Sequence, residues 1–308
     1  MARKNVTVEQ ATKEFLKKAK NKVKESTFSN YSFTCERHIL PYFRGIETSQ
    51  LNDKRINDFI QSKLKNGGIN NNPLSPKTVN DMVRLLLQII KKYSKLNLDV
   101  EKPSYTHKEI DIFTKDEHEN LKSYASIGTD SKKLGIIIVM FTGIRIGELC
   151  ALKWENIDLN SGIISINKTL QRIRTTGEKQ KTKIIIDKPK SSTSIRKIPI
   201  HSALLTKLRE WEYKINGDTY LLTNTEKYIE PRVYRRYFKD YLKVCDIKDN
   251  TFHTLRHTFA TRAISKEMDA KTISVLMGHA DVSFTMKRYI HPDIEHKRIQ
   301  IEKLSDDF

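Results

Sequence analysis

The chain has 308 residues, of which 56 are lysine or arginine and 37 are aspartate or glutamate, so its formal net charge is +19. Such an excess favours a polyanionic partner, because many lysine and arginine contacts release counterions from DNA or RNA. A membrane partner is not expected, since the N-terminus lacks an apolar signal core and the longest clearly apolar run, 136–141, is too short to span a bilayer. The three cysteines are widely separated and show no CxxC spacing, which is typical of reduced packing residues in a cytoplasmic protein.

Residues 1–100 have the pattern of a compact, basic four-helix domain. Apolar residues repeat at helical spacing from Val8 to Ala19, from about Thr27 to Leu40, from Leu51 to Leu64, and from Ser75 to Tyr93. We expect Pro41 to stop the second helix and Gly67 to end the third, because proline removes a helical hydrogen bond and glycine favours a helix C-terminus. Pro76 suits the first turn of the fourth helix.

Residues 101–112 lack helical periodicity and contain Pro103, so we interpret them as a linker to a second domain, residues 113–308. This domain opens with a capping box, T-K-D-E at 114–117. The apolar segment 134–141 predicts a deeply buried helix, and the motif T-G-I-R-I-G-E-L that follows leads into another.

Three β-branched runs, at 162–167, 183–187 and 195–200, predict a small antiparallel sheet in this second domain. The long basic stretch 171–183 between the first two strands is expected either to reach over a DNA backbone or to be a solvated loop. From Leu204 onward the pattern is helical again. The predicted fold is therefore mostly α, with a helical first domain and an α+β second domain.

The stretch T-F-H-T-L-R-H-T-F-A-T-R, residues 251–262, places cationic and titratable side chains among apolar ones. On a helical wheel, Arg256 lies about 40° from Phe252, at the edge of the apolar stripe, while His253 lies further round and His257 beyond it toward solvent. A guanidinium at the margin of a core needs an anion, because a desolvated unpaired charge is expensive. The anion is a carboxylate or a phosphate.

Other candidate residues are unremarkable when each is taken alone. Arg145 could simply pair with Glu148 on one helix face, and Lys190 could be one more solvated lysine. His279 could follow a helix C-cap, and Tyr289 could be a half-buried core residue. His253 and His257 are four residues apart, but neither a glutamate between them nor a nearby cysteine supports zinc, so no metal is expected.

Together, the motifs T-G-x-R-x-G-E-L, H-x-L-R-H-x-x-A-T and L-M-G-H-x-x-x-x-x-T-x-x-Y-x-H resemble the tyrosine recombinase (phage integrase) family. The resemblance implies that 113–308 is the catalytic domain and that 1–100 is a core-binding domain that contacts DNA. It resembles the compact two-domain form, because the first amphipathic helix starts by about Val8. The implied catalytic residues are Arg145, Lys190, His253, Arg256, His279 and Tyr289, with Glu148 as an acidic supporting residue.

The resemblance also implies a reaction in which Tyr289 attacks a DNA phosphate and forms a 3′-phosphotyrosine bond, with no cofactor. Arg145 and Arg256 would clamp the scissile phosphate, and Lys190 would protonate the leaving 5′-hydroxyl. A phenol with an ordinary pKa near 10 needs a base, and His253 is the candidate. His279 would donate a hydrogen bond to the phosphate, whereas His257 is interpreted as structural.

The implied partners are double-stranded DNA and further copies of this chain in a tetramer on paired DNA sites. Four tail residues follow the spacing of one helical face and would dock on a neighbouring copy: Ile294, Ile301, Leu304 and Phe308. A type IB topoisomerase-like relaxing enzyme and a non-catalytic DNA-binding regulator stay open as alternatives. The target DNA sequence, and the choice between integration or excision of a mobile element, DNA inversion and dimer resolution, are not read from side chains.

Overall fold

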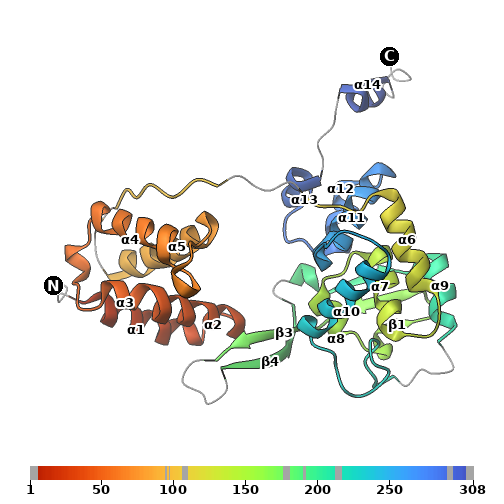
Figure 1. Ribbon diagram of the computed structural model, residues 1–308, viewed down its shortest axis with the longest axis horizontal. Coiled ribbons are helices and arrows are strands. Elements are labelled where there is room, and N and C mark those ends of the chain that lie inside the picture. Colours follow the sequence, from red (N-terminus) through yellow and green to blue (C-terminus); the bar gives the residue numbers. More distant parts are fainter. Residues whose placement is uncertain are drawn as a thin grey trace. The chain divides into compact units, whose positions relative to one another are not determined.

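The computed structural model describes residues 6–93, 96, 98–105, 110–175, 181–189, 192–211, 217–289 and 294–302. It divides into two compact units (Figure 1). The N-terminal unit comprises Met1–Lys108 and Arg172–Lys183, and the second unit comprises Glu109–Gln171 and Ile184–Phe308. The chain is mostly helical with small antiparallel sheets, so the predicted fold class is confirmed. None of the described helices is long and apolar enough to cross a membrane.

The N-terminal unit contains the four predicted helical segments. They are α1 (Val8–Lys20), α2 (Glu25–Thr34) continued by η1 (Cys35–Ile39) and α3 (Leu40–Phe43), α4 (Asp53–Asn66), and α5 (Pro76–Tyr93); short 3₁₀ turns lie at η2 (Thr48–Gln50) and η3 (Ile69–Asn71). Thr7 and Asn52 cap α1 and α4 with side-chain oxygens. The apolar faces of these helices meet in one core, in which Ile39, Phe59 and Leu86 are fully buried.

The expectation that Pro41 stops the second helix is wrong, because the helical path continues to Phe43. Residues Cys35–Ile39 form a π-helical turn, in which the Leu40 N–H donates to the Cys35 carbonyl five residues back. The wider turn restarts the α-helical ladder at Leu40, so Pro41 occupies a first-turn position where no N–H is needed.

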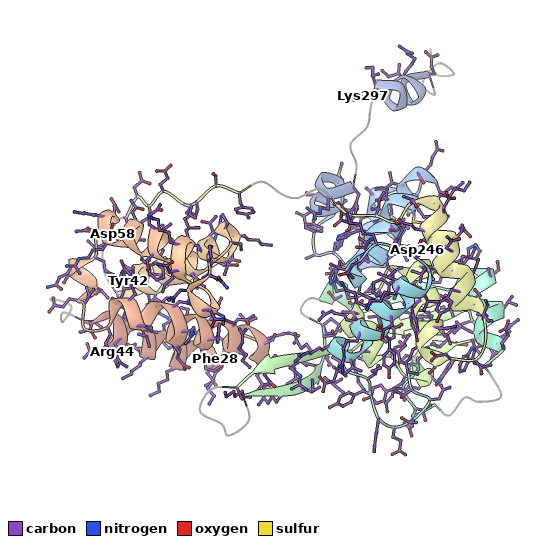
Figure 2. The ribbon with its side chains drawn as sticks, viewed as in Figure 1. Phe28, Tyr42, Arg44, Asp58, Asp246 and Lys297 are labelled. Atoms are coloured by element: carbon purple, nitrogen blue, oxygen red, sulfur yellow. The ribbon has the colours of Figure 1, made fainter. Side chains whose placement is uncertain are left out.

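The basic stretch 171–183 is a β-hairpin in its described residues and not a free loop. Strands β3 (Thr169–Arg174) and β4 (Thr182–Asp187) form a two-stranded sheet of their own. The described end of β3 packs on α2 within the N-terminal unit: the Ser29 hydroxyl donates to the Arg174 carbonyl at 2.8 Å. Phe28 of α2, labelled in Figure 2, lines a small pocket with Ile173. Polar residues separate the buried Leu170 from Ile173, so β3 lacks the alternation that would have predicted a strand.

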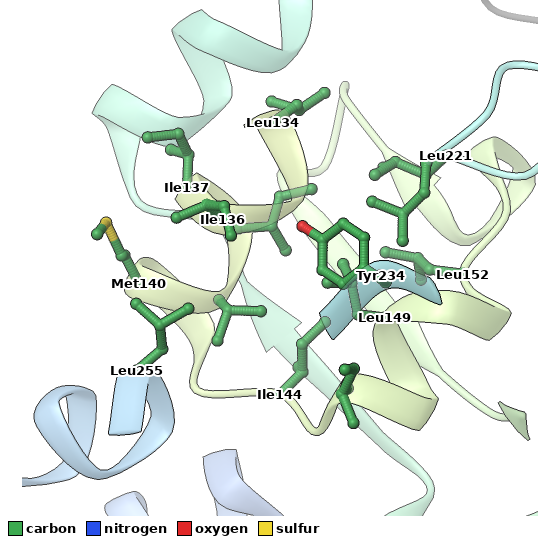
Figure 3. Close-up of a cluster of buried hydrophobic side chains, with 14 of the residues drawn as sticks. Leu134, Ile136, Ile137, Met140, Ile144, Leu149, Leu152, Leu221, Tyr234 and Leu255 are labelled. Atoms are coloured by element: carbon green, nitrogen blue, oxygen red, sulfur yellow. The ribbon is translucent and has the colours of Figure 1, made fainter. Parts of the chain in front are cut away.

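The second unit is a helical domain with a three-stranded sheet. Its elements are α6 (Lys115–Ser126), α7 (Ser131–Thr142), α8 (Ile146–Ala151), η4 (Trp154–Asn156), β1 (Ile157–Asp158), β2 (Ile163–Ile166), η5 (Ser192–Ser194), β5 (Arg196–Pro199), α9 (Ser202–Arg209), α10 (Pro231–Val244), α11 (Phe252–Ser265), α12 (Ala270–Met277), α13 (Val282–Tyr289) and α14 (Ile294–Glu302). The predicted buried helix is α7, and its Ile136 lies in one core cluster with Leu149 of α8 and Tyr234 of α10 (Figure 3). Thr114 caps α6 through the predicted capping box.

Two details of the second unit differ from expectation. The run 183–187 pairs with β3, while β2 pairs with β5 in antiparallel register, Ile164 opposite Ile198, so the strands form two small sheets and not one. The described residues 217–230 are turns and isolated bridges, although the region after Leu204 was expected to be helical throughout. There the backbone pairs with residues around Trp154, and this tertiary pairing replaces the helical hydrogen bonds.

Candidate active site

The turn between α7 and α8 places Arg145 and Glu148. Gly143 closes α7 with a left-handed φ of +62°, and a Cβ there would lie 2.5 Å from the Phe259 ring. Arg145 is the N-cap residue of α8, and its backbone N–H donates to a Glu148 carboxylate oxygen at 2.9 Å. The Arg145 Nη1 donates to the other oxygen at 2.9 Å, so the motif folds into a local clamp around one carboxylate.

Glu148 also holds a second arginine, Arg196 of β5, which the sequence interpretation did not single out. Arg196 Nη2 and Nη1 donate to the two Glu148 oxygens at 2.9 and 3.2 Å. The Glu148 carboxylate is only 2% exposed, and burial alone would raise its pKa. The hydrogen bonds and charges of Arg196 and Arg145 outweigh this effect and lower the pKa, so the carboxylate stays ionised. The signal in the sequence was the strand period, because Arg196 shares the inward face of β5 with Ile198.

Three arginines converge on the C-terminal end of α12. Each donates to a different backbone carbonyl there: Arg196 Nε to Leu276 at 2.6 Å, Arg256 Nη2 to Met277 at 2.7 Å, and Arg145 Nη2 to Gly278 at 2.8 Å. A helix C-terminus leaves carbonyls without intrahelical partners and carries partial negative charge, so guanidinium groups are stabilised at this position. The three segments that carry these arginines are thereby fixed around the turn that precedes His279.

Gly278 and Thr285 orient His279. Gly278 has a left-handed φ of +63°, and a Cβ at this position would approach the Arg196 and Arg145 guanidiniums at 2.9 and 3.2 Å. The His279 Nδ1 lies 2.7 Å from the hydroxyl of the buried Thr285. Burial and the charges of Arg256, Arg145 and Arg196 lower the pKa of His279 to about 3, so its ring is neutral at pH 7 without an anion nearby.

Arg256 on α11 is the most enclosed cation of the group, at 5% exposure. Its Nη1 donates to the Gly143 carbonyl at 2.6 Å, which ties α11 to the end of α7. Burial and then Arg145 lower its pKa to about 9, and it stays protonated at pH 7. Arg145, Arg196 and Arg256 face a single buried carboxylate, Glu148, so this cluster has an excess of positive charge that suits an anion.

The Tyr289 hydroxyl lies 2.6 Å from the Nδ1 of His257. Tyr289 is the last residue of α13 and is buried. The expectation that His257 points toward solvent is wrong, because α13 packs on this side of α11 and leaves the ring only partly exposed. Burial raises the pKa of Tyr289, while Arg256, Arg288 and Arg145 act in the opposite direction. Arg256 and Arg145, both members of the arginine cluster, therefore act electrostatically on the phenol.

His253, the expected proton acceptor, is exposed, and its ring centroid lies 6.3 Å from that of His257. Partial burial and the charges of Arg256, Arg235 and Arg145 lower its pKa. In the part of the chain that the structure describes, the hydrogen bond of the Tyr289 hydroxyl goes to His257 and not to His253. Lys190 lies outside the described residues, so its place relative to the cluster stays a prediction. Among the described residues, no group of three or more His, Cys, Asp or Glu side chains could hold a metal ion.

The helical fold and the cluster of arginine, histidine and tyrosine side chains match a known protein family. The model of the phage integrase family matches residues 111–296, which is more than half of the chain. A second model, the N-terminal SAM-like domain of phage integrases, matches residues 7–64. The chain belongs to the phage integrase family, and the predicted family is confirmed.

The chain is similar to Xer-type recombinases and to proteins named for mobile elements. The chain is 30% identical over 217 residues to a XerC-like tyrosine recombinase of Caldanaerobacter subterraneus, covering 65% of this chain and 55% of that protein. It is 24% identical over 301 residues to the ICEBs1 integrase of Bacillus subtilis, covering 92% and 78% of the two chains. The transposase from transposon Tn916 of Enterococcus faecalis is 26% identical over 214 residues, covering 63% and 51%. The chain thus spans only about half the length of several of the curated relatives that it matches.

Solved structures show the same fold. A Tn1549 transposon integrase in complex with a circular intermediate DNA superposes with a TM-score of 0.78 at 21% identity, covering 97% of this chain and 99% of that one. A λ integrase tetramer bound to a Holliday junction has a TM-score of 0.66 at 16% identity, covering 94% and 80%. At these identities the likeness shows the fold alone.

Proposed function

We propose that this protein is a site-specific DNA recombinase that cuts and rejoins DNA strands through a 3′-phosphotyrosine intermediate. The observation that carries the proposal is the buried Tyr289 hydroxyl within the electrostatic field of Arg256 and Arg145. A nucleophilic oxygen beside preorganised cations suits attack on a phosphodiester, whose non-bridging oxygens gain negative charge in the transition state. Membership of the phage integrase family supports the same activity.

The cluster suggests a division of work around the scissile phosphate. Arg145, which is partly exposed, and the buried Arg256 would bind the non-bridging oxygens, since guanidinium groups stabilise phosphate charge without a metal. His279 would add a hydrogen bond, and Glu148 with Arg196 would hold the Arg145 segment in place. Lys190 is proposed to protonate the 5′-oxygen as the phosphorus–oxygen bond breaks. The phosphotyrosine bond keeps the energy of the phosphodiester, so rejoining needs no nucleotide cofactor.

The names of the relatives favour a role in a mobile element. An integrase of ICEBs1 and a transposase of Tn916 both align with this chain, as do Xer-type recombinases. We therefore propose integration or excision of a mobile element in a bacterial cytoplasm as the biological reaction. Double-stranded DNA carrying the junction of such an element would be the substrate.

A covalent-adduct assay tests the proposal. The protein is incubated with a nicked suicide duplex whose sequence is that of the mobile-element junction next to the gene that encodes this chain. The amount of SDS-resistant protein–DNA adduct is then measured. We expect the wild type to form the adduct, also in EDTA, and Tyr289→Phe to bind the duplex without forming it, because the phenylalanine lacks the attacking oxygen. A DNA-binding regulator would form no adduct in either case. A normal adduct yield from Tyr289→Phe would refute the assignment of the nucleophile.

We further propose that the tail of one copy docks on the second unit of a neighbouring copy in a cyclic tetramer. On α14, Ile294 and Ile301 are 73% and 67% exposed, while Leu304 and Phe308, predicted to share their face, lie outside the described residues. Two large apolar side chains this exposed on one helix indicate an unfilled contact. A head-to-tail exchange of identical segments can close into a ring.

An apolar groove on the second unit is the proposed acceptor. It has a volume of about 670 Å³, with Met140, Phe141, Phe259 and Lys266 among its lining residues. The tail sequence carries several acidic residues, including Glu302, which complement the lysine in this lining. Truncation before Glu295 should leave binding to a single DNA site intact and abolish synaptic tetramers in gel filtration. Tetramers and normal recombination from the truncated protein would refute the exchange.

A further inference from the structure

A histidine outside the predicted catalytic set contacts the reacting oxygen of the proposed nucleophile. The His257 Nδ1 lies 2.6 Å from the Tyr289 hydroxyl, and the two rings are tilted by 47° with centroids 5.7 Å apart. His257 lies one turn after His253 on α11, on the side that α13 covers. Resting on the proposed recombinase function, we propose that His257, and not His253, accepts the phenol proton of Tyr289 during DNA cleavage.

The proton balance of this step is closed by groups of the chain and the DNA. As the Tyr289 oxygen bonds to phosphorus, its proton moves to His257 Nδ1, which must be the unprotonated nitrogen of a neutral ring. The bond from phosphorus to the 5′-oxygen breaks, and that oxygen takes a proton from Lys190. In rejoining, the 5′-hydroxyl returns its proton to Lys190 as its oxygen bonds to phosphorus. The bond from phosphorus to the Tyr289 oxygen breaks, and the His257 imidazolium returns its proton to that phenol oxygen.

The charged surroundings keep His257 in the accepting form. Burial has the largest effect on the pKa of His257, followed by the charges of His253, Arg288 and Arg256. Together they lower this pKa to about 4, while Asp111 acts in the opposite direction. The ring is therefore neutral at pH 7. His279 and Tyr289 are the other titratable groups facing it.

The same contacts leave His253 for a different task. It is exposed and lies in the field of Arg256 and Arg145, the two residues proposed to bind the phosphate. We therefore infer that His253 is free to donate a hydrogen bond to a phosphate bound by these two cations. The two histidines of H-T-L-R-H thus divide the chemistry, with one facing the phosphate and the other the nucleophile.

The test is the pH dependence of single-turnover cleavage of the nicked suicide duplex by His257→Ala and His257→Asn. Between pH 6 and 9 we expect little change in the wild-type rate. His257→Ala should cleave about 10²–10⁴-fold more slowly at pH 7, and its rate should rise about tenfold per pH unit as the phenol ionises without a base. Added imidazole should restore part of the rate. His257→Asn keeps a polar atom near the Nδ1 position but no basicity, so it should be slow with the same slope.

Matched controls separate this inference from the proposed function and from misfolding. Glu210→Gln also removes one titratable group by an amide substitution, at the exposed C-cap of α9 and outside both the arginine cluster and the groove, and should cleave at the wild-type rate. Absence of an adduct from the wild type would refute the recombinase proposal itself. Wild-type rates from His257→Asn, or a His257→Ala rate within about threefold of wild type at every pH, would overturn the role of His257 alone. If His257→Ala loses DNA binding, the His257→Asn rate and slope decide.

Discussion

The two units differ in the kinds of polar side chain that they bury in their cores. In the described part of the N-terminal unit, every buried polar side chain is a neutral hydroxyl or amide or the single histidine His38. The second unit buries a carboxylate, Glu148, with two guanidiniums, Arg196 and Arg256. Burying an unpaired charge is expensive, and even a paired one rarely stabilises a fold more than apolar packing would. Apolar packing therefore accounts for the first core, whereas stability alone does not explain the buried charges of the second, which are consistent with the proposed phosphate site.

The largest expected effect comes from breaking the buried pair. Arg196→Ala leaves Glu148 buried with only the partly exposed Arg145, and we expect the free energy of unfolding of the second unit to fall by about 3–5 kcal/mol. Trp154 and Trp211 are the two tryptophans of the chain and both are buried in this unit, so their fluorescence during urea unfolding reports it specifically.

A double variant sharpens this comparison. Replacing both partners by apolar residues, Arg196→Met with Glu148→Leu, should recover much of the stability, because no buried carboxylate remains without its partner. DNA cleavage should nevertheless be lost, because Glu148 no longer holds Arg145. A midpoint for Arg196→Ala equal to that of the wild type would show that the pair is not a structural element. Recovery of cleavage by the double variant would show that it is not a functional one.

A smaller effect is expected from acidification. The pKa values of His257 and His279 are lowered to about 4 and about 3, below the value of about 6.5 of an unfolded histidine. Between pH 6.5 and pH 4 the unfolded chain binds more protons than the folded one. The contribution of these histidines to the free energy of unfolding is therefore full above pH 6.5 and is lost as the pH falls toward 4. From pH 7 to pH 5 we expect the second unit to lose on the order of 2 kcal/mol, since partial exposure weakens the shift.

Tryptophan fluorescence during urea unfolding at several pH values measures the stability of the second unit. Hydrogen exchange of α4 and α5 measures that of the N-terminal unit as the reference. The N-terminal unit carries one histidine with a lowered pKa among its described residues, His38, and should respond less. A bound phosphate or DNA duplex should diminish the loss, because an anion favours the protonated rings. Equal acid sensitivity of both units would contradict the comparison.

The smallest effect is expected in the apolar core. Ile56→Val removes one buried methylene group from α4 and should lower the stability of the N-terminal unit by about 0.5–1.5 kcal/mol. Hydrogen exchange of α4 and α5 should report the change, while the tryptophan signal and the single-turnover rate on saturating DNA should not move. A slower cleavage step in this variant would mean that the apolar core also tunes the chemistry.

Local patterns in the sequence were enough for much of the fold. The apolar period predicted α1, α5 and α7, because a helix face is defined by residues three and four apart and needs no distant partner. Motif spacing predicted Arg145, Arg256 and His279, and the structure brings all three to the end of α12. Their chemical roles, like the domain boundaries, are predictions that still await experiment.

Only the tertiary structure decided which side chains meet. Arg196 lies 48 residues from Glu148 and shares its carboxylate, and Tyr289 lies 32 residues from His257 and turns that ring away from solvent. A helical wheel cannot show either contact, because it describes one helix and not the element that packs on it. By itself the sequence determined which side chains are present as candidates to bind and attack a phosphate. The packing of α11, α12 and α13 decided which histidine contacts Tyr289, because a 2.6 Å hydrogen bond depends on where two separate helices lie.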